Sequence, residues 1–290
     1  MSIQIDMNLC QRCGHCEPVC VARVFRSSED GSPKIQEERL KSCIHCGQCA
    51  AVCPAGAITA DGIDPATLTP VTSAPFNDTQ REMLFRGRRS VRAYEPRPVA
   101  RELLEEAMDL AANAPTARHV REVCWTVING REKLLPLIKQ TARILEASRK
   151  PNYAGIEKSV EKGNDPIFRG APCLVLAHCE PWRWAETDCA IAVTYMELAL
   201  HSLGLGTCWC GMLINAALMN HQDQLPLNKI GGGRSWRGNV IDAAMHKAPA
   251  NPLDLHLPEG HELYAGLMVG YPAFGYARLP LRKPTEITWL

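Results

Sequence analysis

The chain has 290 residues, with 32 Lys and Arg against 31 Asp and Glu, so its formal net charge is only +1. This balance gives no reason to expect nucleic acid or a membrane surface as a partner, and no run of about 18 apolar residues is present to cross a bilayer. The length has room for two domains, and fourteen cysteines without a secretory leader predict a reducing, cytoplasmic compartment.

Residues 10–53 contain one cysteine pattern twice. In each run three cysteines are two residues apart, a fourth follows after three more, and Gly14 and Gly47 occupy the same place. Such a run presents three thiolates to one cubane cluster, and in two-cluster ferredoxins its fourth cysteine binds the other cluster. The sequence therefore predicts two [4Fe-4S] clusters. The first is assigned to Cys10, Cys13, Cys16 and Cys53, and the second to Cys43, Cys46, Cys49 and Cys20.

Structural zinc and disulfides are the alternative roles for these cysteines. Zinc ribbons usually pair two C-x-x-C knuckles across a long gap, which fits three close cysteines plus a fourth less well. Disulfides would suit a small secreted domain. His15 and His45 are not at equivalent positions of the repeat, so both are interpreted as loop residues rather than ligands.

The first 60 residues are predicted to form a ferredoxin-like unit. A short strand is expected at 3–6 and a polar hairpin around 28–33, with a cluster loop after each. Six basic residues balance six acidic ones, so the unit lacks the acidity that favours docking to a basic partner. This favours electron transfer inside the chain. Residues 61–78, with three prolines and little apolar periodicity, are predicted to be a linker.

The rest of the chain mixes helical and strand patterns. Asp78 followed by Glu82 predicts the start of a helix. Further helices are predicted at 99–113, 132–150 and 184–203, strands at 123–129, 173–178 and 263–269, an exposed polar loop or lid at 152–165, a turn at 207–211 and irregular chain at 216–260. The helix 184–203 is apolar on all sides, which predicts a place in a core or an interface.

The glycine triplet in Gly231-Gly-Gly-Arg-Ser235 is a weak signal for phosphate binding. It lacks the lysine and hydroxyl pattern of a P-loop and follows no clear strand. A flexible insertion is the favoured interpretation.

Several motifs beyond the linker stand in an order that resembles the FMN-binding nitroreductase family. They are Arg88-Arg-Ser-Val-Arg92, Ala114-Pro-Thr116, the strand with Trp125, Phe168-Arg-Gly-Ala-Pro172, Ser202-Leu-Gly-Leu-Gly206, Gly270-Tyr-Pro and Arg282-Lys-Pro284. The resemblance implies an α+β fold with a mixed sheet flanked by helices, forming a homodimer with an extended C-terminal tail. The expected domains are then a two-cluster ferredoxin-like domain at 1–60, the linker at 61–78 and an FMN-binding domain at 79–290.

The resemblance also implies where FMN is held. An Arg-x-Ser-x-Arg element grips the phosphate and ribityl chain in this family, which transfers to Arg88, Ser90 and Arg92, with Arg89 beside them. The terminal basic pair transfers to Arg282 and Lys283. The composition of this region agrees with a phosphate-binding role. Residues 79–150 contain 15 Lys and Arg against 9 Asp and Glu, and the planar guanidinium of arginine can bind a phosphate through two hydrogen bonds. A solvated basic face is the alternative.

Two further contact regions follow from the resemblance. The segment of Pro115 and Thr116 is expected to reach FMN across the dimer interface. An Asn-x-Gln-Pro stretch common in the family reads His119-Val-Arg121-Glu122 here, so His119 is a candidate donor, with a structural histidine as the alternative. The loop that approaches the flavin ring, where a backbone N–H meets N5, corresponds to Trp209, Cys210 and Gly211. With no companion ligands nearby, Cys208 and Cys210 are interpreted as packing or flavin contacts.

The two predicted cofactors together indicate an electron converter. Clusters carry single electrons, and a flavin stores two and delivers a hydride from N5, so no catalytic side chain is required. The expected acceptor is an electron-poor small molecule such as a nitroaromatic or a quinone, and the expected donor is a ferredoxin or NAD(P)H. Two other functions stay open, namely a non-catalytic electron-transfer module serving a protein partner and an FMN-storage or regulatory protein.

Overall fold

The computed structural model describes residues 2–71, 76–222, 253–279 and 281–290. They form two compact units. One is Met1–Pro75 with Thr116–Arg121, and the other is Phe76–Pro115 with Glu122–Leu290. The predicted glycine-rich insertion at 231–235 and part of the predicted linker, 72–75, lie outside the described residues.

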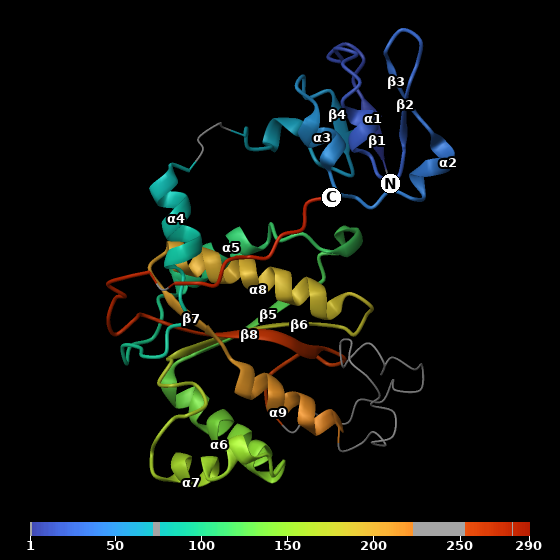
Figure 1. The fold of residues 1–290 in the computed structure, drawn as a ribbon. Coiled ribbons are helices and arrows are strands. Elements are labelled where there is room, and N and C mark those ends of the chain that lie inside the picture. Colours follow the sequence, from blue (N-terminus) through green and yellow to red (C-terminus); the bar gives the residue numbers. More distant parts are fainter. Residues whose placement is uncertain (1, 72–75, 223–252, 280) are drawn as a thin grey trace. The chain divides into compact units, whose positions relative to one another are not determined.

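The first unit consists of two small antiparallel strand pairs and short helices (Figure 1). Ile3 pairs with Ala60, which brings the two ends of this unit together, so that both cysteine runs are looped out between them. The strands are β1 (Ile3–Ile5), β2 (Phe25–Ser27), β3 (Pro33–Ile35) and β4 (Ile58–Ala60), and the helices are α1 (Cys16–Val19), α2 (Glu37–Leu40), α3 (Gln48–Val52) and the 3-10 helix η1 (Pro65–Thr67). The predicted strand at 3–6 and the hairpin around 28–33 are confirmed.

The second unit is built on a four-stranded sheet in the order β5-β6-β8-β7. The strands are β5 (Cys124–Asn129), β6 (Cys173–Cys179), β7 (Gly206–Trp209) and β8 (Glu262–Gly270). Neighbouring strands run antiparallel, and within the described chain a parallel bridge joins Ser90 to Thr207 at the β7 edge. All seven residues of β6 are buried, as expected for a strand covered on both faces.

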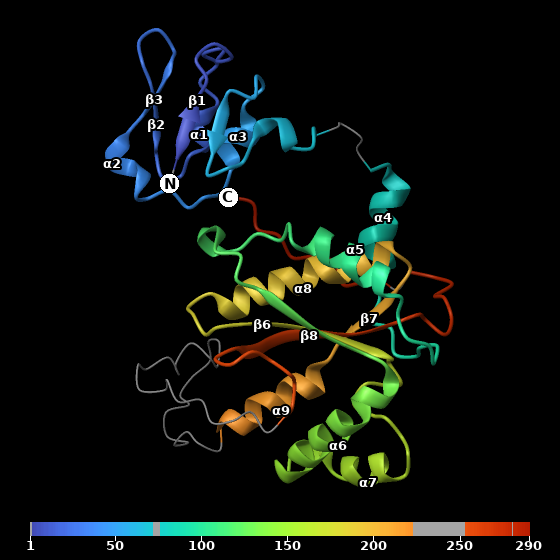
Figure 2. The same ribbon diagram turned by 180° about the vertical axis from the view of Figure 1, so that it is seen from behind.

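Helices cover both faces of this sheet (Figure 2). Leu174 and Leu176 of β6 pack with α6 and α9, and Val175 and Ala177, pointing the other way, pack with α5 and α8. This alternation is the two-residue period of a strand. The helices are α4 (Asp78–Gly87), α5 (Arg101–Ala111), α6 (Arg131–Ala147), α7 (Ile156–Glu161), α8 (Ala185–Ser202), α9 (Gly211–Gln222) and the 3-10 helices η2 (Ala117–His119) and η3 (Pro151–Tyr153).

The strongly periodic elements lie where the sequence predicts them, each within a few residues. The apolar helix α8 is central in its core, with Met196 and Leu200 fully buried against β6 and β8. Within the described ranges, no helix is both long and apolar enough to cross a membrane.

Four predictions about particular segments were wrong. The expected exposed loop at 152–165 contains η3 and α7, and its Tyr153 and Ile156 are buried in the core. The expected turn at 207–211 is the edge strand β7 followed at once by α9, and that helix continues to residue 222 of the expected irregular stretch. Helix α4, the first helix of the second unit, is capped by Asn77, one residue before the predicted cap, in a reciprocal capping box with Gln80.

Candidate functional site

The first unit contains two hollows, each lined by four of the eight repeat cysteines. Their volumes are similar, about 350 Å³ and about 390 Å³, including space open to solvent. The first is lined by Cys10, Cys13, Cys16 and Cys53, and the second by Cys43, Cys46, Cys49 and Cys20. Each hollow thus combines three cysteines of one run with the fourth cysteine of the other, which is the grouping that the repeat predicts.

The backbone around the two hollows repeats as the cysteines do. Gly14 and Gly47 have φ of +73° and +68°, a left-handed conformation that suits glycine and turns each loop into a short helix. The Sγ of Cys20 accepts a hydrogen bond from the Val24 N–H, and the Sγ of Cys53 accepts one from the Ala57 N–H, both at 3.3 Å. A backbone N–H group therefore orients the fourth cysteine of each run, and it can stabilise negative charge on the sulfur.

The electrostatics of the hollows fit a positively charged multi-atom group. Burial raises the pKa of the Cys49 thiol to about 11, and it also raises the pKa of Cys16 and Cys43, with the neighbouring cysteines adding to each rise. Iron would offset this cost, because a metal binds the thiolate form. Thiols that surround a hollow suit a cluster better than one zinc ion.

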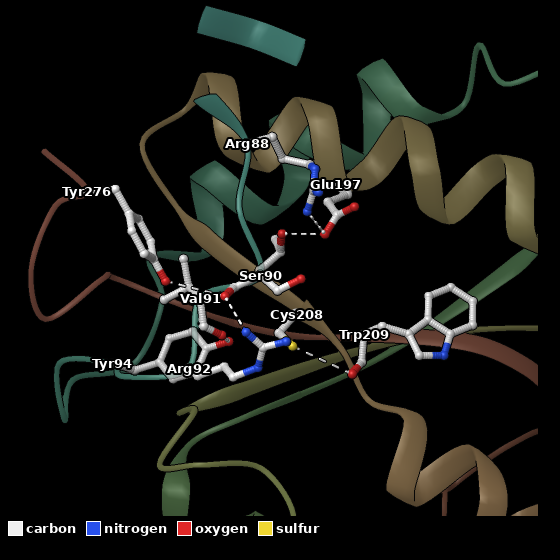
Figure 3. Close-up of polar contacts among 10 residues, drawn as sticks. Arg88, Ser90, Val91, Arg92, Tyr94, Glu197, Cys208, Trp209 and Tyr276 are labelled. Atoms are coloured by element: carbon white, nitrogen blue, oxygen red, sulfur yellow. Dashed lines mark hydrogen bonds and ion pairs between the residues drawn. The ribbon is translucent and has the colours of Figure 1, made fainter. Parts of the chain in front are cut away.

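In the second unit, the arginine-rich segment 88–92 lies along the edge strand β7 (Figure 3). The Val91 N–H donates to the Thr207 carbonyl at 2.8 Å. Gly206 allows this approach, because a Cβ there would lie 2.7 to 2.9 Å from the Val91 side chain. The motif therefore has a fixed place beside the start of β7.

Arg88 is anchored by an acidic residue of α8. Its Nη1 lies 3.1 Å from Oε1 of Glu197, and the same oxygen accepts a hydrogen bond from the Thr207 hydroxyl at 2.9 Å (Figure 3). Both side chains of the ion pair are largely buried. Glu197 is not among the residues predicted from the sequence, because only the packing of α8 beside β7 brings it to the motif.

The other motif side chains face the C-terminal tail and the β7 cysteine. The Tyr276 hydroxyl donates to the Ser90 carbonyl at 3.4 Å, and the Arg89 guanidinium lies 5.1 Å from the centre of the Tyr276 ring. The Ser90 side chain also hydrogen-bonds the Cys208 thiol. Burial raises the pKa of that thiol, and the charge of Arg92 opposes the rise. The basic motif is thus partly covered, and Arg92 is exposed.

The three residues expected at the flavin ring differ from one another in exposure. Trp209 ends β7 and is 44 % exposed, and Cys210 is buried, with its N–H bonded to the Gly266 carbonyl at 3.0 Å. Gly211 begins α9, where an N–H has no acceptor within its own helix. The role of a free backbone donor therefore suits Gly211 better than Cys210, which packs where a Cβ on Gly266 would meet its sulfur.

The remaining predicted contact residues are not joined to the basic motif by a described interaction. Pro115 is exposed after α5, and the Thr116 hydroxyl accepts from the Arg121 N–H at 3.1 Å. Thr116 and His119 belong to the first compact unit and Arg88 belongs to the second, so the part of Thr116 and His119 in the site stays a prediction. Arg282 and Lys283 are exposed in the tail, and within the described residues neither forms a hydrogen bond or an ion pair.

Both parts of the chain match known families. Residues 85–231 match the nitroreductase family, and residues 9–58 match the 4Fe-4S dicluster domain. A curated protein of Methanothermobacter thermautotrophicus, provisionally named an NADH dehydrogenase/NAD(P)H nitroreductase, is 31% identical over 131 residues. That match covers 43% of this chain and 57% of the relative, so the chain spans little more than half of the curated relative's length.

Solved structures show the same fold. A nitroreductase with bound FMN from Bacteroides fragilis is 25% identical, with a TM-score of 0.53, and a nitroreductase with bound FMN from Desulfitobacterium hafniense is 20% identical, with a TM-score of 0.52. Each similarity covers 74% of this chain and 100% of the other one. The remaining quarter of this chain is close to the length of the unit that contains the cysteine repeat.

Proposed function

Because the chain belongs to the nitroreductase family and has a 4Fe-4S dicluster domain before the family region, we propose that it transfers electrons from two [4Fe-4S] clusters through FMN to an electron-poor small molecule. A nitroaromatic or a quinone is the proposed acceptor. The observation that carries this proposal is the crossed grouping of eight cysteines around two hollows, in a chain that also aligns an arginine-serine motif along a sheet edge.

The cysteines of the two hollows would hold the clusters. In each hollow three loop thiols and one thiol oriented by a backbone N–H supply four ligands, the number that a cubane cluster requires. Eight cysteines in two groups of four support two clusters. Burial raises the pKa of Cys16, Cys43 and Cys49, and bound iron would offset this because a metal binds the thiolate form.

The basic segment beside β7 would hold FMN. Arg88, Arg89 and Arg92 supply positive charge and Ser90 a hydroxyl, which suits a phosphate. At the other end of β7 the Gly211 N–H can donate to a ring nitrogen, and the exposed Trp209 side chain can contact the acceptor. When bound, FMN supplies hydride transfer, and the residues named here bind it and orient the acceptor.

The tail supports a homodimeric form. Leu281, Trp289 and Leu290 are 87 % or more exposed, and large apolar side chains in that number favour burial by a partner. A second subunit would then cover the tail and bring Arg282 and Lys283 into a complete FMN site, together with Pro115, Thr116 and His119. A cytoplasmic location, with ferredoxin or NAD(P)H as donor, completes the proposal.

Turnover with matched donors tests this function. The full chain and its Cys13→Ser/Cys46→Ser variant, loaded with equal FMN, are given a nitroaromatic acceptor with either reduced ferredoxin or dithionite. We expect the variant to lose activity with ferredoxin and to keep it with dithionite, because dithionite reduces the flavin directly. Equal activity of both proteins with every donor would exclude the clusters from the route. If the acceptor is reduced only when another protein is added, the chain is instead an electron-transfer module.

A further inference from the structure

The turn that leads into β6 is organised by one carboxylate, that of Asp165. Its Oδ1 accepts the N–H groups of Ile167 at 3.1 Å and Phe168 at 2.8 Å, and its Oδ2 accepts the N–H of Gly170 at 2.8 Å. Oδ2 also lies 2.7 Å from Nη1 of Arg131. With both oxygens used twice and the side chain 8% exposed, Asp165 fixes the backbone of this turn.

Arg169 is the residue that the turn presents to solvent. Phe168 before it is fully buried, whereas Arg169 is exposed, and its φ of +56° is left-handed. A side chain in this conformation costs about 1 kcal/mol or more. Other arginines of the chain share the conformation, so φ alone does not indicate a function. What distinguishes Arg169 is its location.

The turn meets the basic motif at Gly270 of β8. A Cβ on Gly270 would lie 2.7 Å from Pro172, three residues after Arg169, and 2.8 Å from Tyr94, two residues after Arg92. The Tyr94 hydroxyl in turn donates to the Val91 carbonyl at 2.7 Å. Two segments far apart in the sequence are therefore packed on the same glycine.

The charges of Arg92 and Arg169 act on the same two groups. Burial raises the pKa of the Tyr94 hydroxyl and of the Cys208 thiol, and for both groups the two arginines oppose the rise. Within the described ranges neither arginine has an ion-pair partner, in contrast to Arg88 with Glu197. Two unpaired guanidinium groups near one point of a sheet edge repel each other unless an anion lies between them.

We propose that Arg169 is a further FMN-binding residue, held by Asp165 and acting with Arg92 on the anionic part of the cofactor. This inference rests on the proposed function, since it adds a residue to the same FMN site. The turn accounts for the geometry, because the bonds to Asp165 hold Arg169 in a conformation that an arginine otherwise disfavours. Such local strain is common where the surrounding structure positions a functional residue.

Titration of FMN-free full-length protein with FMN, followed by flavin fluorescence, tests the inference. Arg169→Gly is the main variant, because glycine adopts a positive φ without a Cβ penalty and so keeps the turn. Arg149→Gly is the matched control, since Arg149 is also exposed with φ of +55° but lies at the end of α6. We expect a rise in the FMN Kd of about tenfold or more for Arg169→Gly, no change for Arg149→Gly, partial recovery in Arg169→Lys, and equal melting temperatures for the two glycine variants.

The outcomes separate this inference from the proposed function. Suppose that the wild-type protein binds FMN, that Arg88→Ala binds it more weakly, and that Arg169→Gly binds it as tightly as the wild type. This result would overturn the role of Arg169 and leave the proposed function intact. Wild-type protein that takes up no FMN would overturn both. If Arg169→Gly melts at a lower temperature than Arg149→Gly, and Arg169→Lys does not lower the raised FMN Kd, then Arg169 serves stability alone and its binding role is overturned.

Discussion

Arg88 and Glu197 form an ion pair with Nη1 and Oε1 3.1 Å apart, although 109 residues separate them in the chain. The pair joins the segment after α4 to α8, and Glu197 also holds the Thr207 hydroxyl of β7. One carboxylate therefore links three elements at the start of the edge strand. Arg88 is oriented by this contact, and Arg89 and Arg92 supply the charge that it does not neutralise.

Glu197→Ala is expected to weaken FMN binding and lower stability. It leaves the largely buried Arg88 guanidinium without its partner and the Thr207 hydroxyl without an acceptor, which costs on the order of 1–3 kcal/mol. We expect the FMN Kd to rise about tenfold, equivalent to 1.4 kcal/mol. Glu186→Ala, an exposed glutamate on the same helix, is the matched control. Unchanged FMN affinity in Glu197→Ala would show that Arg88 needs no anchor.

Paired cysteine variants test the crossed grouping of the clusters. Cys10→Ser/Cys53→Ser removes two ligands from one hollow, and Cys10→Ser/Cys20→Ser removes one from each. The first variant is expected to keep about four irons per chain in one intact cluster, whereas the second damages both clusters. Iron analysis with EPR of the reduced protein distinguishes them. The reverse pattern would mean that each run of four cysteines binds its own cluster.

Gly206→Ala is expected to destabilise the second unit. The new methyl group would lie 2.7 Å from a Val91 carbon, so the motif segment must move away from β7. Overpacking of this kind costs about 1–3 kcal/mol. Thermal unfolding measures the loss, and FMN titration shows whether the motif has moved. In the Val91→Gly background, which also removes the Val91 Cβ that would lie 2.9 Å away, the same substitution should cost clearly less, and equal costs in both backgrounds would exclude this contact as the cause.

The stability of the second unit is expected to depend on pH through His178. This side chain is 2% exposed, with Thr126 on one ring nitrogen at 3.0 Å and His261 on the other at 2.9 Å. Burial, followed by the charge of His261, lowers its pKa from 6.5 to about 4. The unfolded chain therefore binds more protons than the folded one between these values, so stability is lost as pH falls from about 6.5 to about 4.

Denaturant unfolding from pH 7.5 to 4.5 measures this dependence. Because clusters are sensitive to acid, the comparison uses wild-type protein and His178→Gln on the Cys13→Ser/Cys46→Ser background. The glutamine is uncharged throughout, so the slope of stability against pH should be smaller in that variant. Parallel curves for the two proteins would mean that His178 does not carry the dependence.

The elements that could be predicted are those with a long repeating pattern. The apolar run of β6 and the periodicity of α5, α6 and α8 each specify one structure, because many residues agree on it. Short elements provide no such agreement. In α7 only Ile156 is buried, and β7 has four residues, so neither could be separated from a loop or a turn by its sequence.

The site could be predicted where residues close in sequence act together. The Arg88–Arg92 motif lies on one segment, and the three closely spaced cysteines of each run line one hollow together with the fourth cysteine of the other run. Glu197 and Arg169 could not be predicted, because each reaches the motif only through the packing of α8 and of the turn before β6. The domain boundaries at 60 and 78 and the tail contacts of Arg282 and Lys283 stay predictions.

Cofactor analysis of the anaerobically purified full-length protein tests the central claim most directly. Iron, acid-labile sulfide and FMN are quantified together with the absorption spectrum before and after dithionite. We expect about eight irons and eight sulfides per chain, as two cubane clusters require, with one FMN, and bleaching of both cofactors on reduction. Zinc in place of iron, or a chain with full clusters and no affinity for FMN, would contradict it.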